Sequence, residues 1–204
     1  MERSLRPNET FRRLWASDFP AYRAHLLRLG PKARYSRFFG AMSDDVIMRH
    51  AEKCFGPDCL LYGYFADGVL RAAAELHVID PGATHYTGEA EAAFSVERDE
   101  RHSGVGSLLM DRLARAARNR RLRKIVFTCL PQNVAMQSLA KKFGAKLRFG
   151  HDEVLGELAA HLPTMQSIFA EIVDDSFGFA EAAFDLQQQI FHPSNDRGHR
   201  LNAA

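Results

Sequence analysis

The hydrophobic residues of this chain change their spacing along the sequence, which predicts strands alternating with helices. Short apolar runs typical of strands cover residues 10–15, 59–66, 69–79, 90–96, 124–129, 145–149 and 153–159. Apolar residues recur at helical spacing over residues 18–29, 43–53, 105–118 and 133–143. The predicted order is therefore β-α-α-β-β-β-α-β-α-β-β.

Local signals mark the ends of several predicted elements. Asp67-Gly68 separates two apolar runs and favours a two-residue hairpin turn. Asn133 is placed to cap the helix that follows it, and Gly144 is placed to end that helix. Residues 33–39 mix arginines with aromatic residues, and we expect a short connector there.

The order of elements predicts an α/β domain with a mixed central β-sheet flanked by helices and one βαβ crossover. We assign this domain to residues 1–160, and a helical extension with a disordered tail to residues 161–204. Gly178 interrupts the helical spacing of the extension, which predicts two helical stretches. Such an extension packs either on its own domain or on a partner subunit, for example in a homodimer, and the pattern leaves both open.

Composition narrows the class of protein. The chain has 204 residues, 46% of them hydrophobic, and its net charge of +2 is too close to neutral for a typical nucleic-acid-binding or membrane-surface protein. The three cysteines, Cys54, Cys59 and Cys129, form no CxxC pair, so we expect no metal site and no disulfide framework. The chain lacks an 18-residue apolar run and a leader-like N-terminus, which predicts a soluble, cytoplasmic protein.

A glycine-bearing loop joins the strand over 90–96 to the helix that begins near residue 105. Its residues are Arg101, His102, Ser103, Gly104, Val105, Gly106 and Ser107. Glycine lets the backbone approach a ligand, and a helix N-terminus favours an anion such as a diphosphate. The loop is neither a dinucleotide fingerprint nor a P-loop, because position 109 is leucine and no Gly-Lys-Ser/Thr ends it. A turn that simply needs glycine is the alternative.

The pattern Arg101-x-x-Gly104-x-Gly106 between a strand and a helix resembles motif A of the GNAT superfamily, the acetyl-CoA-dependent N-acetyltransferases. The predicted order of elements, over about residues 4–160, is also that of the GNAT fold. The resemblance implies that the backbone from Arg101 to Ser107 holds the diphosphate of acetyl-CoA. It further implies that the backbone of Phe94, Ser95 and Val96 pairs with the pantetheine arm as an added strand would.

A second match to the superfamily is Asn133-Val134-Ala135-Met136, ahead of Phe143-Gly144. The resemblance implies that Asn133 and Met136 lie at the cofactor, although a plain helix N-cap explains Asn133 equally well. Many members have a tyrosine at the position of Ala140, where it protonates the departing thiolate. In this chain the departing thiolate is protonated by another residue or by solvent, or it leaves without an acid. A thiol pKa of about 8.5 makes unassisted departure feasible.

Glu91 is the candidate general base. An amine acceptor such as lysine, with a pKa of about 10.4, must lose a proton before it attacks a thioester. We expect the apolar strand to desolvate Glu91 and make it a better base; a structural ion pair or a solvent-facing carboxylate is the alternative. The Ala-Glu-x-Ala-Phe stretch around Glu91, the 34–39 connector and Asn133-x-x-Met136 resemble bacterial protein-lysine acetyltransferases, which implies this role for Glu91 and a lysine acceptor.

The leading prediction is therefore an N-acetyltransferase that uses acetyl-CoA and no metal, and in which a primary amine attacks the thioester directly. A non-catalytic acyl-CoA-binding regulator is the alternative. A nucleic-acid-binding module would use the arginines between Arg112 and Lys124, but we expect those to form a solvated face. Glu75 and His77 share one face of a strand and could relay protons, although a strand histidine more often has a structural role.

Overall fold

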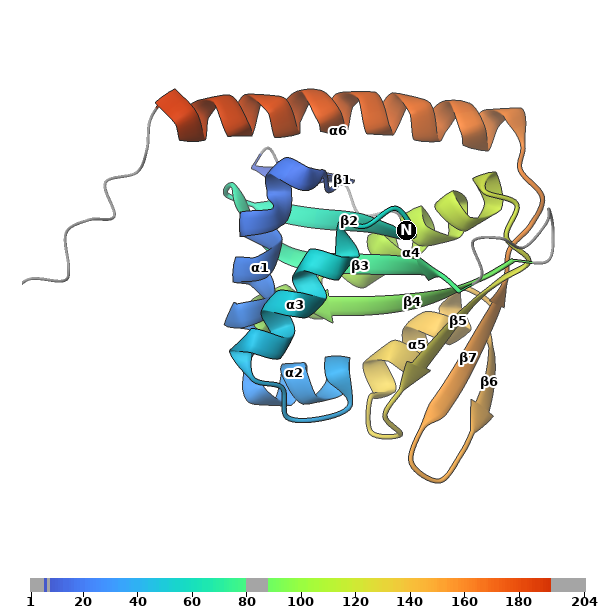
Figure 1. Ribbon diagram of the computed structural model, residues 1–204. Coiled ribbons are helices and arrows are strands. Elements are labelled where there is room, and N and C mark those ends of the chain that lie inside the picture. Colours follow the sequence, from blue (N-terminus) through green and yellow to red (C-terminus); the bar gives the residue numbers. More distant parts are fainter. Residues whose placement is uncertain (1–5, 7, 80–87, 192–204) are drawn as a thin grey trace, which may run out of the picture.

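The computed structural model describes residue 6, residues 8–79 and residues 88–191 (Figure 1). The helices are α1 (Phe19–Arg28), α2 (Pro31–Phe38), α3 (Asp44–Cys54), α4 (Val105–Asn119), α5 (Val134–Lys142) and α6 (Met165–Phe191). The strands are β1 (Glu9–Arg13), β2 (Cys59–Ala66), β3 (Val69–Val78), β4 (Glu89–Val96), β5 (Lys124–Cys129), β6 (Lys146–Phe149) and β7 (Val154–Ala159). The tail predicted after the last helix lies outside the described residues.

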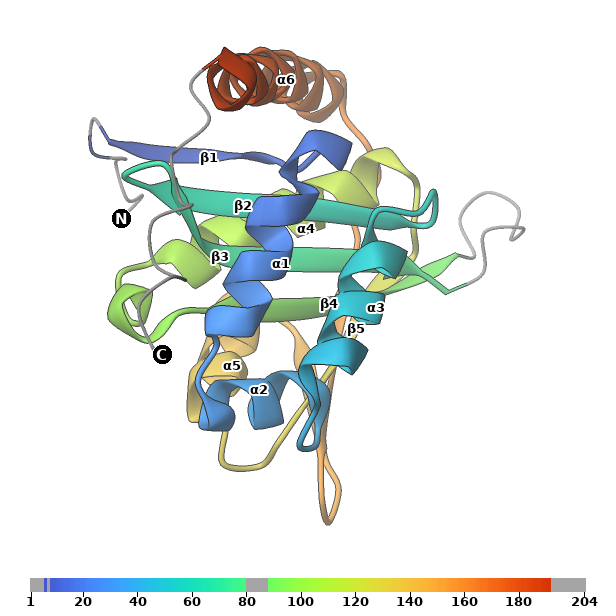
Figure 2. The same ribbon diagram turned by 60° about the vertical axis from the view of Figure 1, so that its left-hand side comes forward.

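The strands form one seven-stranded mixed sheet in the order β1-β2-β3-β4-β5-β7-β6. Every neighbouring pair is antiparallel except β4 and β5, which are parallel. Helices α1 and α3 cover one face of the sheet, and α4 and α5 lie behind it (Figure 2). The predicted mixed sheet flanked by helices is confirmed, as is the hairpin at Asp67 and Gly68, where both residues have positive φ.

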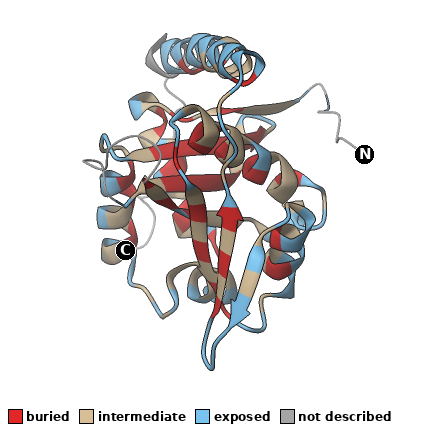
Figure 3. Ribbon diagram, turned by 90° about the vertical axis from the view of Figure 1, so that its right-hand side faces the viewer, coloured by how far each residue is buried: buried red, intermediate tan, exposed pale blue. Residues whose placement is uncertain are grey.

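Two apolar layers hold the helices to the sheet, and the buried positions concentrate in its central strands (Figure 3). Leu109, Met110 and Leu113 of α4 are fully buried on one face. Tyr22 and Leu26 of α1 are fully buried on the other. Burial of each such side chain contributes about 1.5–3 kcal/mol, so these layers fix the helices against the strands. No helix within the described ranges combines the length and the apolar character needed to span a bilayer.

Residues 33–39, predicted as a connector, instead belong mostly to helix α2. Gly30 and Pro31 end α1 and at once begin α2, with the proline at the first helical position. Arg34 donates from Nε to the Leu29 carbonyl at 2.9 Å and from Nη2 to the Leu27 carbonyl at 2.5 Å. The arginine therefore satisfies carbonyls at the end of α1, a partnership that the local sequence does not reveal.

The C-terminal extension forms one continuous helix, α6, so the predicted interruption at Gly178 is wrong. Helix α6 lies across β1, above the edge of the sheet (Figure 1). A Cβ at Gly178 would lie 3.0 Å from the Cβ of Arg12 on β1. The glycine therefore permits close packing of the helix on the strand and does not break it. The helix packs on its own domain but also exposes Phe169 and Phe177, so a partner subunit remains open.

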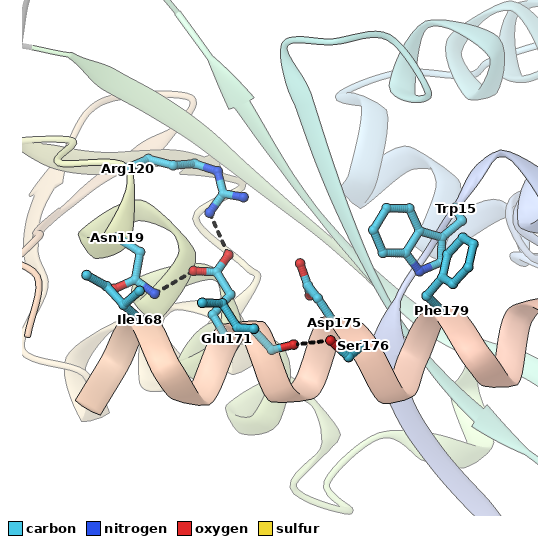
Figure 4. Close-up of a pocket in the computed structure, with 9 residues that line it drawn as sticks. Trp15, Asn119, Arg120, Ile168, Glu171, Asp175, Ser176 and Phe179 are labelled. Carbon is cyan, nitrogen blue, oxygen red and sulfur yellow. Dashed lines mark hydrogen bonds and ion pairs between the residues drawn. The ribbon is translucent and has the colours of Figure 1, made fainter. Parts of the chain in front are cut away.

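Two arginines of α4, Arg112 and Arg115, are not free on a solvated face as we expected, because α6 supplies an acidic partner for them. Asp174 pairs with both Arg112 and Arg115, at 2.5 Å from Nη2 of the latter. Figure 4 shows Glu171 between Arg120 and Asn119 in the groove under α6, with Arg120 Nη1 at 2.6 Å. Helix α6 thus neutralises three of the seven cations between Arg112 and Lys124, which weakens the case for a nucleic-acid-binding surface there.

Gly156 should be indispensable to the sheet. It lies opposite Phe127 in the β5–β7 register, and a Cβ at Gly156 would fall 1.9 Å from the ring of Phe127. That ring is 1% exposed and has no room to move. We expect Gly156→Ala to lower the free energy of unfolding by about 3 kcal/mol in urea denaturation, whereas Gly40→Ala, in open space, should change it by less than about 1 kcal/mol. Equal stabilities of the two variants would contradict this reading.

Candidate functional site

The sheet opens between β4 and β5. The two strands pair at only three positions, and the last of these joins Glu91 to Val126. Beyond it, among the described residues, β4 pairs only with β3 and β5 only with β7. Figure 1 shows the two strands diverging. The backbone of β4 from Ala92 to Val96 therefore presents unpaired groups to the gap, which is the arrangement that an added extended ligand needs.

The side chains of the predicted cofactor strand hold it to the layers on both faces. Phe94 and Val96 pack against the core that contains α4. Ser95 points to the other face, is 5% exposed, and has its Oγ 2.8 Å from Nε2 of His25. Their backbone groups are left to face the gap, so the arrangement fits the expected main-chain contact of these three residues with the pantetheine arm.

The predicted glycine loop leads directly from β4 into the N-terminus of α4. Gly104 is the N-cap with φ of 91°, a left-handed conformation that favours glycine, and its carbonyl accepts from the Ser107 N–H at 3.0 Å. Ser103 donates from Oγ to the Glu100 carbonyl at 2.6 Å, which closes the turn before the helix. The N–H groups of Val105 and Gly106, the first two residues of α4, have no acceptor within the helix, so the loop has donors that a diphosphate needs.

Gly106 differs from Gly104 in that the fold does not require it. It lies in the first turn of α4 with ordinary helical geometry, and a Cβ would meet only Leu139 Cδ2 at 3.5 Å, an ordinary contact. Neither backbone conformation nor internal packing explains a glycine here. The expected close approach of the cofactor diphosphate to this backbone would explain the glycine, and that contact stays a prediction.

Lys142 is a residue that the sequence analysis missed. It lies in the last turn of α5, and its Nζ donates to Oγ of Ser107 at 2.9 Å, which places a cation at the start of α4. Arg101 and His102 are exposed in the same loop. No sequence spacing joins Lys142 to this loop, because the two meet only when α5 packs beside α4.

The second predicted motif forms the start of α5. Asn133 Oδ1 accepts from the Met136 N–H at 3.2 Å, so the asparagine is a helix N-cap, and Met136 packs against the core. The structure thus brings out the local role of Asn133, while its contact with a cofactor stays a prediction. Ala140 is fully buried against the same core, so this position offers no proton donor to a leaving thiolate.

Glu91 lies at the point where β4 and β5 separate, opposite His77 in the β3–β4 register. Its side chain is exposed, so the desolvation that we expected from its apolar neighbours is not observed. The alternation of the strand explains this, because Ala90 and Ala92 face the core while Glu91 faces the opposite side. The carboxylate is accessible to a substrate at the mouth of the opening.

Glu75 and His77, the predicted relay residues, do share one face and meet directly. His77 Nε2 lies 2.8 Å from Oε2 of Glu75, while Arg37 and Tyr22 each lie 2.5 Å from Oε1. Burial raises the pKa of Glu75, but Arg37, His50 and His77 together hold it well below its usual range. Hydrogen bonds with Cys54 and Glu75 raise the pKa of His77 to about 10. At neutral pH neither group is a free base.

A second buried network anchors the end of β4. His25 is fully buried between Ser95 and Glu97, with Nδ1 3.0 Å from Glu97 Oε1. Arg28 and Arg71 also bind the Glu97 carboxylate, at 2.9 and 3.0 Å. Burial alone would raise the pKa of Glu97, but His25 and the two arginines lower it to about 2. Burial lowers the pKa of His25, which favours the neutral ring.

Comparisons with known proteins assign the chain to a family. A sequence profile of the Acetyltransferase (GNAT) family matches residues 9–145. The chain belongs to this family of acetyl-CoA-dependent acetyltransferases.

Solved structures with the same fold include three acetyltransferase-type proteins. The GNAT domain of PAT from S. lividans is 23% identical, with a TM-score of 0.62 over 73% of this chain and 89% of that one. A Salmonella typhimurium protein solved with its cofactor acetyl-CoA is 17% identical, with a TM-score of 0.53 over 76% of this chain and 95% of that one. The ribosomal-protein-S18-alanine N-acetyltransferase from Escherichia coli is 16% identical, with a TM-score of 0.58 over 77% of this chain and 97% of that one.

Gly106→Ala should show whether the glycine is needed for acetyl-CoA binding or for the stability of the fold. Alanine is favoured over glycine in a helix by up to about 1 kcal/mol, so the variant should be at least as stable as the wild type. If the backbone at Gly106 approaches the diphosphate, the added methyl should weaken acetyl-CoA binding about 10-fold or more in calorimetric titration. Ser138→Ala on the exposed face of α5 is the control and should leave the affinity unchanged. Unchanged affinity of Gly106→Ala would show that the loop is only a turn.

The Glu97 network should make the fold acid-sensitive. A carboxyl with a pKa of about 2 in the folded protein and 4.5 in the unfolded chain stabilises the fold above pH 4.5, and this contribution is lost as the pH falls toward 2. Glu97→Gln should therefore lower Tm at pH 7 by roughly 2–4 °C. It should also make Tm fall less steeply between pH 4.5 and pH 2. Circular dichroism melts across pH measure this. The exposed Glu153→Gln should leave the profile as in the wild type.

Proposed function

We propose that this chain transfers the acetyl group of acetyl-CoA to a primary amine, and that a protein lysine is the acceptor class. The observation that carries the proposal is the opening of the sheet beyond Glu91 and Val126, directly before the N-terminus of α4. It would seat a pantetheine arm along β4 and a diphosphate at the loop. The fold shared with the GNAT domain of the S. lividans acetyltransferase supports the choice of acceptor to test first.

In the proposed reaction the amine nitrogen attacks the thioester carbonyl, a C–N bond forms, and the C–S bond breaks. Glu91 takes the proton that the amine must lose, because Glu75 and His77 are held by each other and by Arg37. Backbone N–H groups at the end of β4, that of Val96 among them, stabilise the oxyanion. With alanine at position 140, the CoA thiolate leaves without a side-chain acid and takes its proton from solvent.

A non-catalytic acyl-CoA-binding regulator is the second candidate. Two observations favour it: Glu91 is exposed, and Ala140 is buried where many members of the superfamily have a tyrosine. This candidate keeps the same cofactor site, so binding of acetyl-CoA alone does not distinguish the two. Turnover does.

Glu91→Gln tests the proposal. Because the side chain does not enter the gap lined by the β4 backbone, the variant should bind acetyl-CoA as the wild type does. Loss of the base should lower the rate of acetyl transfer to lysine-bearing protein or peptide about 100-fold or more at pH 7. Glu89→Gln, on the same strand but paired with Lys124, is the matched control and should retain most activity.

Three outcomes are informative. Tight binding by all variants with no transfer to any amine by the wild type would favour the regulator. Equal transfer rates for Glu91→Gln and the wild type would remove Glu91 from the mechanism. Failure of the wild type to bind acetyl-CoA would reject both candidates.

A further inference from the structure

Helix α6 has its charged residues on one side and its apolar residues on the other. It contains no lysine, arginine or histidine. The acidic residues of α6 whose side chains the structure describes all pair with arginines of the domain beneath, and they are Glu171, Asp174, Asp175 and Glu181. These ion pairs hold the helix to β1 and to the end of α4. The described part of its outward side is left without charge.

The outward side of α6 is apolar and uncovered. Figure 2 looks along the helix and shows no other described element above it, and Figure 3 shows this side exposed. Four phenylalanines of the helix are 58–71% exposed, namely Phe169, Phe177, Phe179 and Phe184. At about 200 Å² for each side chain, they present roughly 500 Å² to solvent.

This exposed area is larger than a monomer usually has. Met165 and Ile172 are 82% and 58% exposed, which raises the apolar area to about 700 Å². The largest apolar patch on a typical monomer is about 300–600 Å². A standard protein interface buries about 800 Å² on each partner. The outward side of α6 therefore has almost the area that a stable dimer needs.

The exposed residues also have the spacing by which two helices pack side by side. Positions on α6 alternate by four and three residues, which is the heptad pattern of paired helices. All members of this seam are exposed, and they are Met165, Phe169, Ile172, Ser176, Phe179, Ala183 and Leu186. The seam runs along most of the helix, so a second helix can contact it over several turns.

We propose that α6 pairs along this seam with α6 of a second copy of the chain, in an antiparallel arrangement. A two-fold axis through the middle of the seam then sets Ile172 opposite Ala183, and Ser176 opposite Phe179. Each large side chain meets a small one, so the two helices interdigitate. A parallel pair would instead set Ser176 against Ser176 and Ala183 against Ala183, which leaves gaps at both levels.

The charges of α6 favour a second copy over other occupants. Helices that lie on a lipid surface commonly have lysine and arginine available to the headgroups, and α6 has neither. A partner that binds through opposite charge would find no described charge on the outward side. An identical uncharged seam has no such requirement, and its large and small residues fit each other.

The proposed dimer leaves the acetyl transfer site of each copy free. Helix α6 packs on β1, and β2 and β3 separate β1 from the opening between β4 and β5 (Figure 1). The dimer therefore does not depend on the proposed function, and each can be tested without the other.

The oligomeric state of the full chain tests the proposal. Sedimentation equilibrium and light scattering should give twice the mass of one chain, with a dissociation constant of about 1 μM or tighter. Ile172→Glu should weaken the dimer about 100-fold or more, because it buries an unpaired charge in the seam of both copies. Ile79→Glu is the matched control, since Ile79 is 56% exposed at the end of β3, and this variant should dimerise as the wild type does.

A second substitution tests the direction of the helices. Adding Ala183→Lys to Ile172→Glu should restore most of the dimer, because the new charges face each other only across an antiparallel pair. Circular dichroism checks that the variants fold. All of them should keep the wild-type affinity for acetyl-CoA.

A monomeric wild type at every concentration would overturn the proposal, whether or not it binds vesicles of phosphatidylcholine and phosphatidylserine. Equal dimerisation of Ile172→Glu and the wild type would place the interface elsewhere and overturn it too. A lack of rescue by Ala183→Lys would overturn the antiparallel arrangement. A dimer that fails to bind acetyl-CoA would reject only the proposed function.

Discussion

The parallel pairing of β4 with β5 over only three positions is the constraint on which the rest of the site depends. A closed sheet would satisfy the β4 backbone on both sides and leave nothing for an extended ligand to bind. In a sheet that opens between two strands, other contacts must hold those strands in place. The structure does this by burying Phe94 and Val96 against the α4 layer and by fixing Ser95 to the buried ring of His25. The unpaired backbone is thus rigid because the side chains are anchored on both faces.

The two faces of the sheet are held by different interactions. The α4 face is a continuous apolar core. The opposite face contains, beside its apolar residues, the buried carboxylate of Glu75 and the partly buried carboxylate of Glu97, each paired with arginine and histidine. Buried charges need close partners, since removal of one partner leaves an uncompensated charge. Their partners come from β3 and from α1, α2 and α3, so the same pairs that neutralise the carboxylates also tie these helices to the sheet.

Signals contained within a few residues predicted their structures well. Asp67-Gly68 gave the hairpin, and Gly104 the turn before α4, because each needs a backbone conformation that few residues adopt. Features that depend on distant partners were not predictable. Arg34 supports a helix end, Gly178 packs on β1, and Lys142 reaches Ser107 only once the elements have assembled. The exposure of Glu91 was not predictable for the same reason. The sequence of the strand shows which residues alternate between its two faces, but it does not show which face other elements leave uncovered.

Exposure of Glu91 is compatible with the catalytic role that we propose for it, because binding of the two substrates would cover the carboxylate. A carboxylate at the mouth of an opening becomes desolvated when an acyl chain and an acceptor cover it, and burial in that complex favours proton uptake. A carboxylate already buried in the free protein would need a partner, as Glu75 does, and that partner would hold it in its charged form. Glu75 is therefore held in its charged form by its partners, whereas the exposed Glu91 is the carboxylate to which we assign the base in the proposed reaction.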